Sequence, residues 1–164
     1  MTPRDRRLLE RAMAGKIHAW RGLPDGVTDE DLAAFGGGGP ARATRLSGMT
    51  VNARDYTAGP GRVRAFFDDD DHAFLVWIDD PFPPGQTVLP PAGLGPPEAE
   101  LFGVGDRLSG SMQLVWASRG LTLFVSIGQR AILGLALYKP TDASYYQTWL
   151  GATESTPYRP RGRR

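Results

Sequence analysis

The sequence predicts an α+β fold in which two similar helix-plus-antiparallel-sheet units follow one another in tandem, with a helix at each end of the chain. The first indication is the segment Arg119–Pro140, where the apolar runs Leu121–Val125 and Ala131–Tyr138 flank a short break at Gly128. Leucines alternate with other residues in the second run, which is the period of a strand with one face on a core. A similar rhythm recurs in Arg62–Pro81, and the 21 glycines and 14 prolines favour short elements and turns.

The two predicted hairpins match each other in the sequence. A shift of 59 residues lays Val63–Pro81 on Thr122–Pro140 without a gap. The triplets Ala34-Phe35-Gly36 and Leu101-Phe102-Gly103 likewise each close a short acidic segment that we interpret as a helix. We therefore expect Phe35 and Phe102 to be buried at equivalent places. The apolar positions of the hairpins coincide too, since Phe74, Val76 and Ile78 fall on Leu133, Leu135 and Leu137.

Pro and Gly positions divide the chain into segments. Seven prolines fall between Pro81 and Pro97, and this stretch must be extended because proline cannot continue a helix. The predicted segments are an N-terminal helix and short strand (1–21), a first unit (22–81), a Pro-rich connector (82–97), a second unit (98–140), a C-terminal helix (141–152) and a basic tail (153–164).

Capping residues mark the helices that the sequence predicts. Thr2 precedes a helix from Pro3 to about Gly15, and Thr28 opens another with three acidic residues in its first turn. Thr141 or Asp142 caps the last helix, which runs through Leu150. The remaining predicted elements are a short strand over Lys16–Trp20, a strand around Met49–Ala53, a helix over Pro97–Phe102 and a strand over Gln113–Ala117.

This order of elements, a short helix ended by Phe-Gly, a loop, a strand and a hairpin, resembles the tandem-repeat fold of the β-lactamase inhibitor proteins and the small outer-membrane assembly lipoproteins. The resemblance covers about residues 20–140 and rests on element order and the Phe-Gly positions at 35–36 and 102–103. It implies an architecture of two helix-plus-sheet repeats. Exported proteins of that kind often carry cysteines, whereas this chain has none, so the resemblance is not extended to their activities.

The distribution of charge separates an acidic body from basic ends. Residues 1–21 and 157–164 each carry a net charge of +4, and residues 22–156 carry −7. The absence of cysteine excludes disulfides and thiolate metal sites. We find neither the apolar stretch of a signal peptide nor the length of a membrane span, and we expect a cytoplasmic protein.

No arrangement of residues predicts catalysis, a metal or a cofactor. His18 and His72 are far apart in the sequence, and no serine stands in a nucleophile motif. The acidic run Asp68–Asp71 before His72 lacks the alternating spacing of a calcium loop, so a solvated hairpin tip is its simplest interpretation, and contact with a basic partner is the functional one.

Three other features also have a structural and a functional interpretation. Gly36–Gly39 lacks the Lys-Ser/Thr of a phosphate-binding loop and is interpreted as a helix terminator. The arginine-rich end PYRPRGRR is interpreted as a tail, and nucleic-acid binding is not expected. An aromatic group is interpreted as core instead of a pocket lining: Trp77, Trp116, Phe124, Tyr138 and Trp149.

The leading functional prediction is a non-enzymatic domain that binds another, basic protein. One concrete form is an intracellular immunity-type or inhibitor protein that neutralises a basic toxin or enzyme. The alternatives are a small-molecule-binding or enzymatic domain with a pocket between two sheets, and a structural accessory subunit of a larger assembly. The sequence gives no oligomeric state. The predicted contact residues are Asp68, Asp69, Asp70, Asp71, Asp79 and Asp80.

Overall fold

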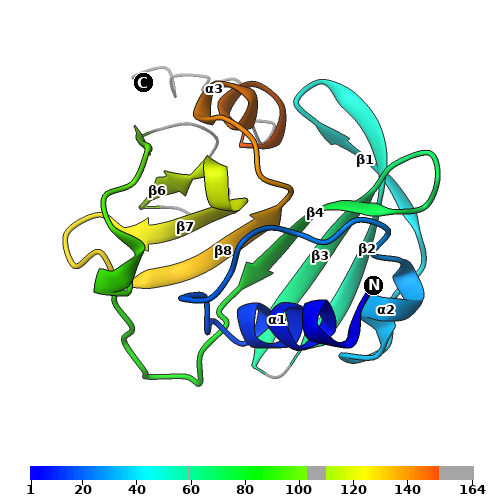
Figure 1. Cartoon of the computed structure of the whole chain (residues 1–164), viewed down its shortest axis with the longest axis horizontal. Helices are drawn as coiled ribbons and strands as arrows, with labels where there is room; N and C mark the ends of the chain where they lie inside the picture. Colours follow the sequence, from blue (N-terminus) through cyan, green and yellow to red (C-terminus); the bar gives the residue numbers. More distant parts are fainter. Residues whose placement is uncertain (59, 103–109, 152–164) are drawn as a thin grey trace, which may run out of the picture.

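A single antiparallel sheet of eight strands dominates the computed structural model, which describes residues 1–58, 60–102 and 110–151 (Figure 1). Its strand order is β1-β2-β3-β4-β8-β7-β6-β5. The strands are β1 (Arg42–Leu46), β2 (Met49–Ala58), β3 (Gly61–Phe67), β4 (Ala73–Asp79), β5 (Ala99–Phe102), β6 (Ser111–Trp116), β7 (Leu121–Ser126) and β8 (Ile132–Tyr138). The helical elements are α1 (Pro3–Met13), α2 (Asp29–Ala33), the 3₁₀ turns η1 (Ala92–Leu94) and η2 (Ala117–Arg119), α3 (Ala143–Tyr145) and the π-helix η3 (Tyr146–Leu150).

The predicted α+β fold of two helix-plus-sheet units is wrong. Strand β4 pairs with β8 from Leu75↔Tyr138 to Asp79↔Gly134, so the strands of both halves belong to one continuous sheet. The helical elements are short, and the second half of the chain opens with a strand instead of a helix. The sheet, and not a pair of helix-covered units, therefore organises the molecule.

The segment 98–102 shows why the predicted second-unit helix does not form. Its residues have good helix propensity, but Ala99–Phe102 pairs with β6 as the edge strand β5. The Glu98 amide also donates to the Val115 carbonyl over 2.7 Å. Pairing with an existing sheet satisfies these backbone groups and overrides a weak local preference.

The two hairpins expected from the apolar periodicity are confirmed. Strands β3 and β4 pair from Arg62↔Asp79 to Phe67↔Ala73, and β7 and β8 pair from Leu121↔Leu137 to Val125↔Ile132. They occupy the middle of the sheet, where β4 and β8 lie next to each other. The strand predicted over Gln113–Ala117 is also present, as β6 (Ser111–Trp116).

A third hairpin, β1–β2, was predicted only as one strand around Met49–Ala53. Its two-residue turn is Ser47-Gly48, with φ of 50° and 81°. Positive φ at both turn positions is the geometry that matches the twist of hairpin strands. Serine in the first position is a weak signal for such a turn, which is why the sequence pattern did not reveal it.

The predicted helix starts are confirmed by their caps. Thr2 forms a capping box with Asp5, and Thr28 forms one with Asp31, so each side chain satisfies a backbone amide of the other. Asp142 caps α3 by accepting the Tyr145 amide over 2.7 Å. The π-helix η3 then continues the C-terminal helix to Leu150.

The predicted strand over Lys16–Trp20 is a turn. The Trp20 amide donates to the Ile17 carbonyl over 3.0 Å, which bends the chain so that both side chains point to the core. The Trp20 indole N–H donates to the Gly120 carbonyl over 3.0 Å. This buried hydrogen bond anchors the N-terminal segment on the β7–β8 side of the sheet.

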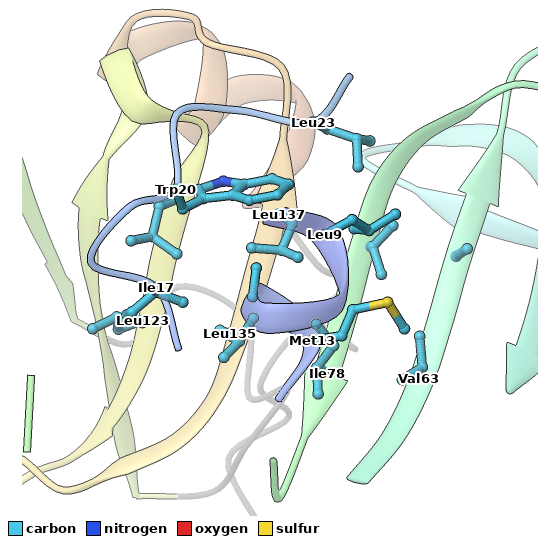
Figure 2. Packing of buried hydrophobic residues seen from close by; sticks show 14 of the residues in the cluster. Leu9, Met13, Ile17, Trp20, Leu23, Val63, Ile78, Leu123, Leu135 and Leu137 are labelled. Atoms are coloured by element: carbon cyan, nitrogen blue, oxygen red, sulfur yellow. The ribbon is translucent and has the colours of Figure 1, made fainter. Parts of the chain in front are cut away.

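The main core lies between α1, the segment that follows it, and one face of the sheet, which we call the inner face. Figure 2 shows Leu9 and Met13 of α1 directed at the strands, with Ile17 and Trp20 beside them. The basic N-terminal helix therefore docks on its own body. The labelled strand residues of this core are Val63, Ile78, Leu123, Leu135 and Leu137.

A second core lies on the opposite, outer face of the sheet, beneath the C-terminal helix. It joins strand residues such as Phe66, Leu75 and Tyr138 to Tyr146 and Leu150 of η3. Of the aromatic group interpreted as core, four members are buried, but the Trp149 side chain is 41% exposed. Those four are Trp77, Trp116, Phe124 and Tyr138.

The expected burial of the two Phe-Gly phenylalanines is half wrong. Phe35 is partly buried and packs against the inner core, whereas Phe102 is 61% exposed on the edge strand. Because β5 is the last strand in the sheet formed by the described residues, its side chains have fewer neighbours to pack against. Gly103 and the basic tail lie outside the described residues.

No helix in the described part of the chain has the length and apolar character needed to cross a membrane. The Pro-rich connector is mostly irregular, with the single 3₁₀ turn η1, as the prolines predict. It is tied to the sheet where the Ile132 amide donates to the Val88 carbonyl over 2.8 Å.

Candidate functional site

A pocket of about 470 Å³ opens on the outer face of strands β2, β3 and β4. Strand register builds it, because Asp55 pairs with Arg64 and Arg64 with Trp77, so these three side chains form one row across the face. The adjacent row contains Thr57, Arg62 and Asp79. Trp77 is 8% exposed and is the aromatic side chain of the outer-face lining, beside the charged side chains of both rows.

The charges around this pocket largely neutralise one another. Arg64 binds Asp55 through two hydrogen bonds, Nε to Oδ1 over 2.7 Å and Nη2 to Oδ2 over 3.1 Å. The hydrogen bond to Arg64 holds the pKa of Asp55 below its usual range, and it also raises the pKa of Arg64. Among the described residues, Arg62 makes one long ion-pair contact, 3.8 Å, with Asp80, and its side chain is 77% exposed.

The glycine-rich segment 36–39 contributes Gly37 to the lining of the pocket. It runs along the edge of β2 beyond the end of β1, where the Gly39 amide donates to the Asp55 carbonyl over 2.8 Å. The Thr57 amide donates to the Gly36 carbonyl over 3.2 Å. A Cβ on Gly36 would lie 1.9 Å from the Thr57 carbonyl oxygen, so only glycine allows this approach. The segment covers a strand edge, which agrees with its interpretation as a structural element.

The acidic run Asp68–Asp71 forms the tip of the β3–β4 hairpin, as its structural interpretation predicts. The Asp68 carboxylate accepts the amides of Asp70 and His72 over 3.0 and 2.9 Å, so it closes the turn itself. Asp69, Asp70 and Asp71 are exposed.

The neighbourhood of this tip adds further negative charge. A β-bridge between Thr28 and His72 holds the tip beside the start of α2, where Glu30 is exposed. The other two carboxylates of that helix start are engaged in the fold. Tyr56 donates to Asp29, which also pairs with Arg54 over 3.2 Å, and Asp31 caps the helix. We call Glu30 and Asp69–Asp71 the acidic corner.

The predicted contact residues do not form one site. Asp79 is the last residue of β4 and Asp80 follows it, at the end that lies six residues or about 20 Å from the tip at the rise of a strand. Asp79 lines the outer-face pocket, and Asp80 pairs with Arg62 at its rim. The sequence pattern did not predict the pocket, although the alternation of Arg62, Arg64 and Phe66 along β3 was a signal of a mixed outer face.

The C-terminal helix forms a ridge on the outer face, which we call the C-terminal ridge (Ala143–Leu150). Tyr146 packs inward, stacked on Tyr138 with ring centroids 4.9 Å apart, and its hydroxyl donates to Gln113 over 2.7 Å. The Ser47 hydroxyl donates to the Trp149 carbonyl over 2.9 Å. Tyr145 and Trp149 point the other way and are 50% and 41% exposed.

A smaller pocket of about 380 Å³ lies beneath the Pro-rich connector. Trp116 lines it and donates from its indole N–H to the Gly95 carbonyl over 3.3 Å. Its remaining walls are mostly prolines and aliphatic side chains, with Arg130 at the edge. Arg130 pairs with Glu100 over 3.1 Å. This hollow lacks the several converging polar groups that orient a small-molecule ligand.

Catalytic chemistry has no assembled group in the described part of the chain. His18 lies beside Arg11, 3.5 Å from its guanidinium, and His72 is in the hairpin tip. Ser118 donates to Glu98 with both its hydroxyl and its amide, which fixes the turn η2. The partner of this hydroxyl is therefore a carboxylate and not a histidine. No group of three or more His, Asp or Glu side chains is placed to hold a metal within the described ranges.

Comparison with protein-family models, curated proteins and solved structures gave no match for this chain. The resemblance to the β-lactamase inhibitor proteins and outer-membrane lipoproteins therefore stays a prediction.

Proposed function

We propose that this chain is a non-enzymatic protein-binding domain that meets a basic partner with its acidic corner. The observation that carries the proposal is the Thr28–His72 bridge. It brings exposed carboxylates of two separate segments, Glu30 and Asp69–Asp71, to one place on the surface. An immunity-type or inhibitor protein that neutralises a basic toxin or enzyme is the concrete form of this function.

The structure of the acidic corner supports binding through long-range electrostatic attraction. The Asp68 carboxylate stabilises the tip through backbone hydrogen bonds, so the side chains of Asp69 and Asp70 are not needed to close the turn. Exposed like charges in a fixed turn raise the rate at which an oppositely charged protein associates. They contribute little to the stability of the fold itself.

The test is a double variant, Asp69→Asn with Asp70→Asn, assayed with the partner that the chain recovers from native lysate. Asparagine keeps the shape and the turn preference, so charge is the variable. We expect the association rate to fall at low salt and the loss to shrink as salt is raised, because exposed charges are screened over about 10 Å at 0.1 M. Thermal unfolding should be unchanged.

The matched control is Asp79→Asn with Asp80→Asn, which removes the same charge at the opposite end of β4. If both double variants lowered the association rate equally, the net charge of the chain, and not the position of the acidic corner, would control association. An unchanged association rate for the Asp69 and Asp70 variant at low salt would contradict the proposal.

A further inference from the structure

The outer face of the sheet carries two unlike features at opposite ends. The C-terminal ridge contacts Ser47 at the β1–β2 turn, which is where β2 begins. The outer-face pocket lies at the other end of β2, around Asp55 and Thr57. The first feature projects from the face, and the second is hollow.

The C-terminal ridge lacks charged residues and exposes two aromatic side chains, as the centre of a protein–protein interface does. Residues 143–151 contain no charged side chain, although the whole chain is 23% charged. Tyr145 and Trp149 are four residues apart and both face away from the body. Large aromatic side chains enriched on a charge-free surface are typical of the centre of protein–protein contacts.

The outer-face pocket is complementary to the ridge, because it is a hollow that contains an aromatic side chain. Its lining combines the aromatic side chain of Trp77 with paired charges, such as Asp55 with Arg64. An aromatic side chain next to mutually neutralised charges can receive an aromatic anchor from a partner. Its volume of about 470 Å³ is large enough for an indole ring with part of its neighbours.

One charge pair fits this contact as well. The charged residue nearest the ridge is Asp142, an exposed carboxylate that caps the helix. The most exposed charge at the pocket is Arg62, whose ion pair within the described part of the chain is the long 3.8 Å contact to Asp80. A ridge seated in the pocket therefore brings a carboxylate and a largely exposed guanidinium into the same interface.

We propose that a second copy of this chain covers the outer face, with the ridge of each copy seated in the pocket of the other. A twofold axis running across the strands exchanges the two ends of the face. One rotation thus forms two equal ridge-to-pocket contacts, which is the reciprocal geometry of a twofold dimer. The proposal goes beyond the binding function above and uses none of the residues of the acidic corner.

Sedimentation equilibrium of the full chain, from low micromolar to near-millimolar concentration, tests the dimer. Two variants remove one feature each: Trp149→Gln takes the aromatic anchor from the ridge, and Thr57→Trp fills the pocket. In a homodimer of either variant, both ridge-to-pocket contacts carry the substitution. We therefore expect the dimer dissociation constant to rise roughly tenfold or more. Thr50→Trp places the same residue on the opposite side of β2 and should leave association unchanged.

Mixing the two variants gives the sharpest result. A mixed dimer retains one intact contact, because the open pocket of the Trp149→Gln copy receives the ridge of the Thr57→Trp copy. We expect the mixture to dimerise more strongly than either variant alone. Tyr145→Gln is a second ridge variant if Trp149→Gln lowers the unfolding midpoint.

Three outcomes would overturn the proposal. The first is a wild-type chain that stays monomeric at every concentration, which would leave the face to a different protein. The second is a dimer that neither the ridge nor the pocket variants weaken. The third is a mixture that associates no better than its components, since a reciprocal interface requires recovery.

Discussion

Residue-level constraints are sharpest at Gly120, in the turn before β7. Its φ is +59°, and a Cβ there would lie 1.8 Å from the Tyr138 carbonyl oxygen. Gly120→Ala should lower the free energy of unfolding by about 3 kcal/mol or more, because backbone atoms would have to separate. Gly26 has a similar φ of +69° with open space around it, so Gly26→Ala should cost only about 1–2 kcal/mol. Equal losses in urea denaturation would contradict the close approach.

The buried hydroxyl of Tyr138 provides a second test. It contacts the Thr122 hydroxyl over 2.9 Å and donates to the Leu121 carbonyl over 3.0 Å, and burial raises the pKa of the Tyr138 phenol. Tyr138→Phe removes the phenol hydroxyl and leaves both of its buried partners without that hydrogen bond. We therefore expect the free energy of unfolding to fall by about 1–3 kcal/mol. Adding Thr122→Val should cost less than the two single changes together, as a double-mutant cycle by chemical denaturation would show.

The Asp55–Arg64 pair predicts a small dependence of stability on pH. The folded-state pKa of Asp55 is below its unfolded value, so the pair contributes above the unfolded pKa, and this contribution is lost as the pH falls through the folded value. Both side chains are about half exposed, so the contribution is under about 1 kcal/mol. Asp55→Asn should destabilise at pH 7 and approach the wild type below about pH 4. Asp69→Asn, a change at an exposed tip, is the control.

At the scale of elements, the edge strand β5 differs from the strands in the middle of the sheet. Phe102 is 61% exposed, so Phe102→Ala should change the free energy of unfolding by less than about 1 kcal/mol. Phe66 on β3 is buried and packs edge-on against Trp77 with ring centroids 4.6 Å apart. Phe66→Ala should cost about 3–5 kcal/mol in the same denaturation experiment. A large loss for Phe102→Ala would place it in a core after all.

Elements with a strong local signal could be predicted from the sequence, and those decided by pairing could not. Alternating apolar residues located β7 and β8, and Thr2 and Thr28 marked their helices because caps are local chemistry. The segment 98–102 has helix-forming residues, and only contact with β6 makes it a strand. Local propensity contains no information on that contact.

The candidate sites divide in the same way. Asp68–Asp71 was predicted as a turn because aspartate favours turns, and the turn is there. The outer-face pocket depends on the register of three strands, which places Arg64 beside Asp55 and Trp77. A shift of one residue would turn every side chain to the other face, so sequence alone could not assemble it.

At the scale of the whole molecule, the sheet makes both halves of the chain dependent on each other. Strand β4 lies between β3 and β8, and the inner core joins Leu9 and Trp20 to strands of both halves. The two hairpins have similar patterns, yet neither half has a complete core. Unfolding should therefore be one cooperative transition, without an intermediate in which half the sheet persists.

Fragments of the chain test this dependence directly. The fragment 1–97 ends before β5, so it would leave β4 as an exposed edge from Leu75 to Asp79 and would uncover the inner core under α1. We expect 1–97 and 98–164 each to lack a cooperative urea transition by circular dichroism, since the unpaired edge and exposed apolar surface remove more than the marginal stability of a domain. Mixed together, the fragments should regain a transition with tryptophan fluorescence and circular dichroism coinciding. A cooperative transition of fragment 1–97 alone would show instead that the first four strands form an independent unit, and that the pairing of β4 with β8 only joins two domains.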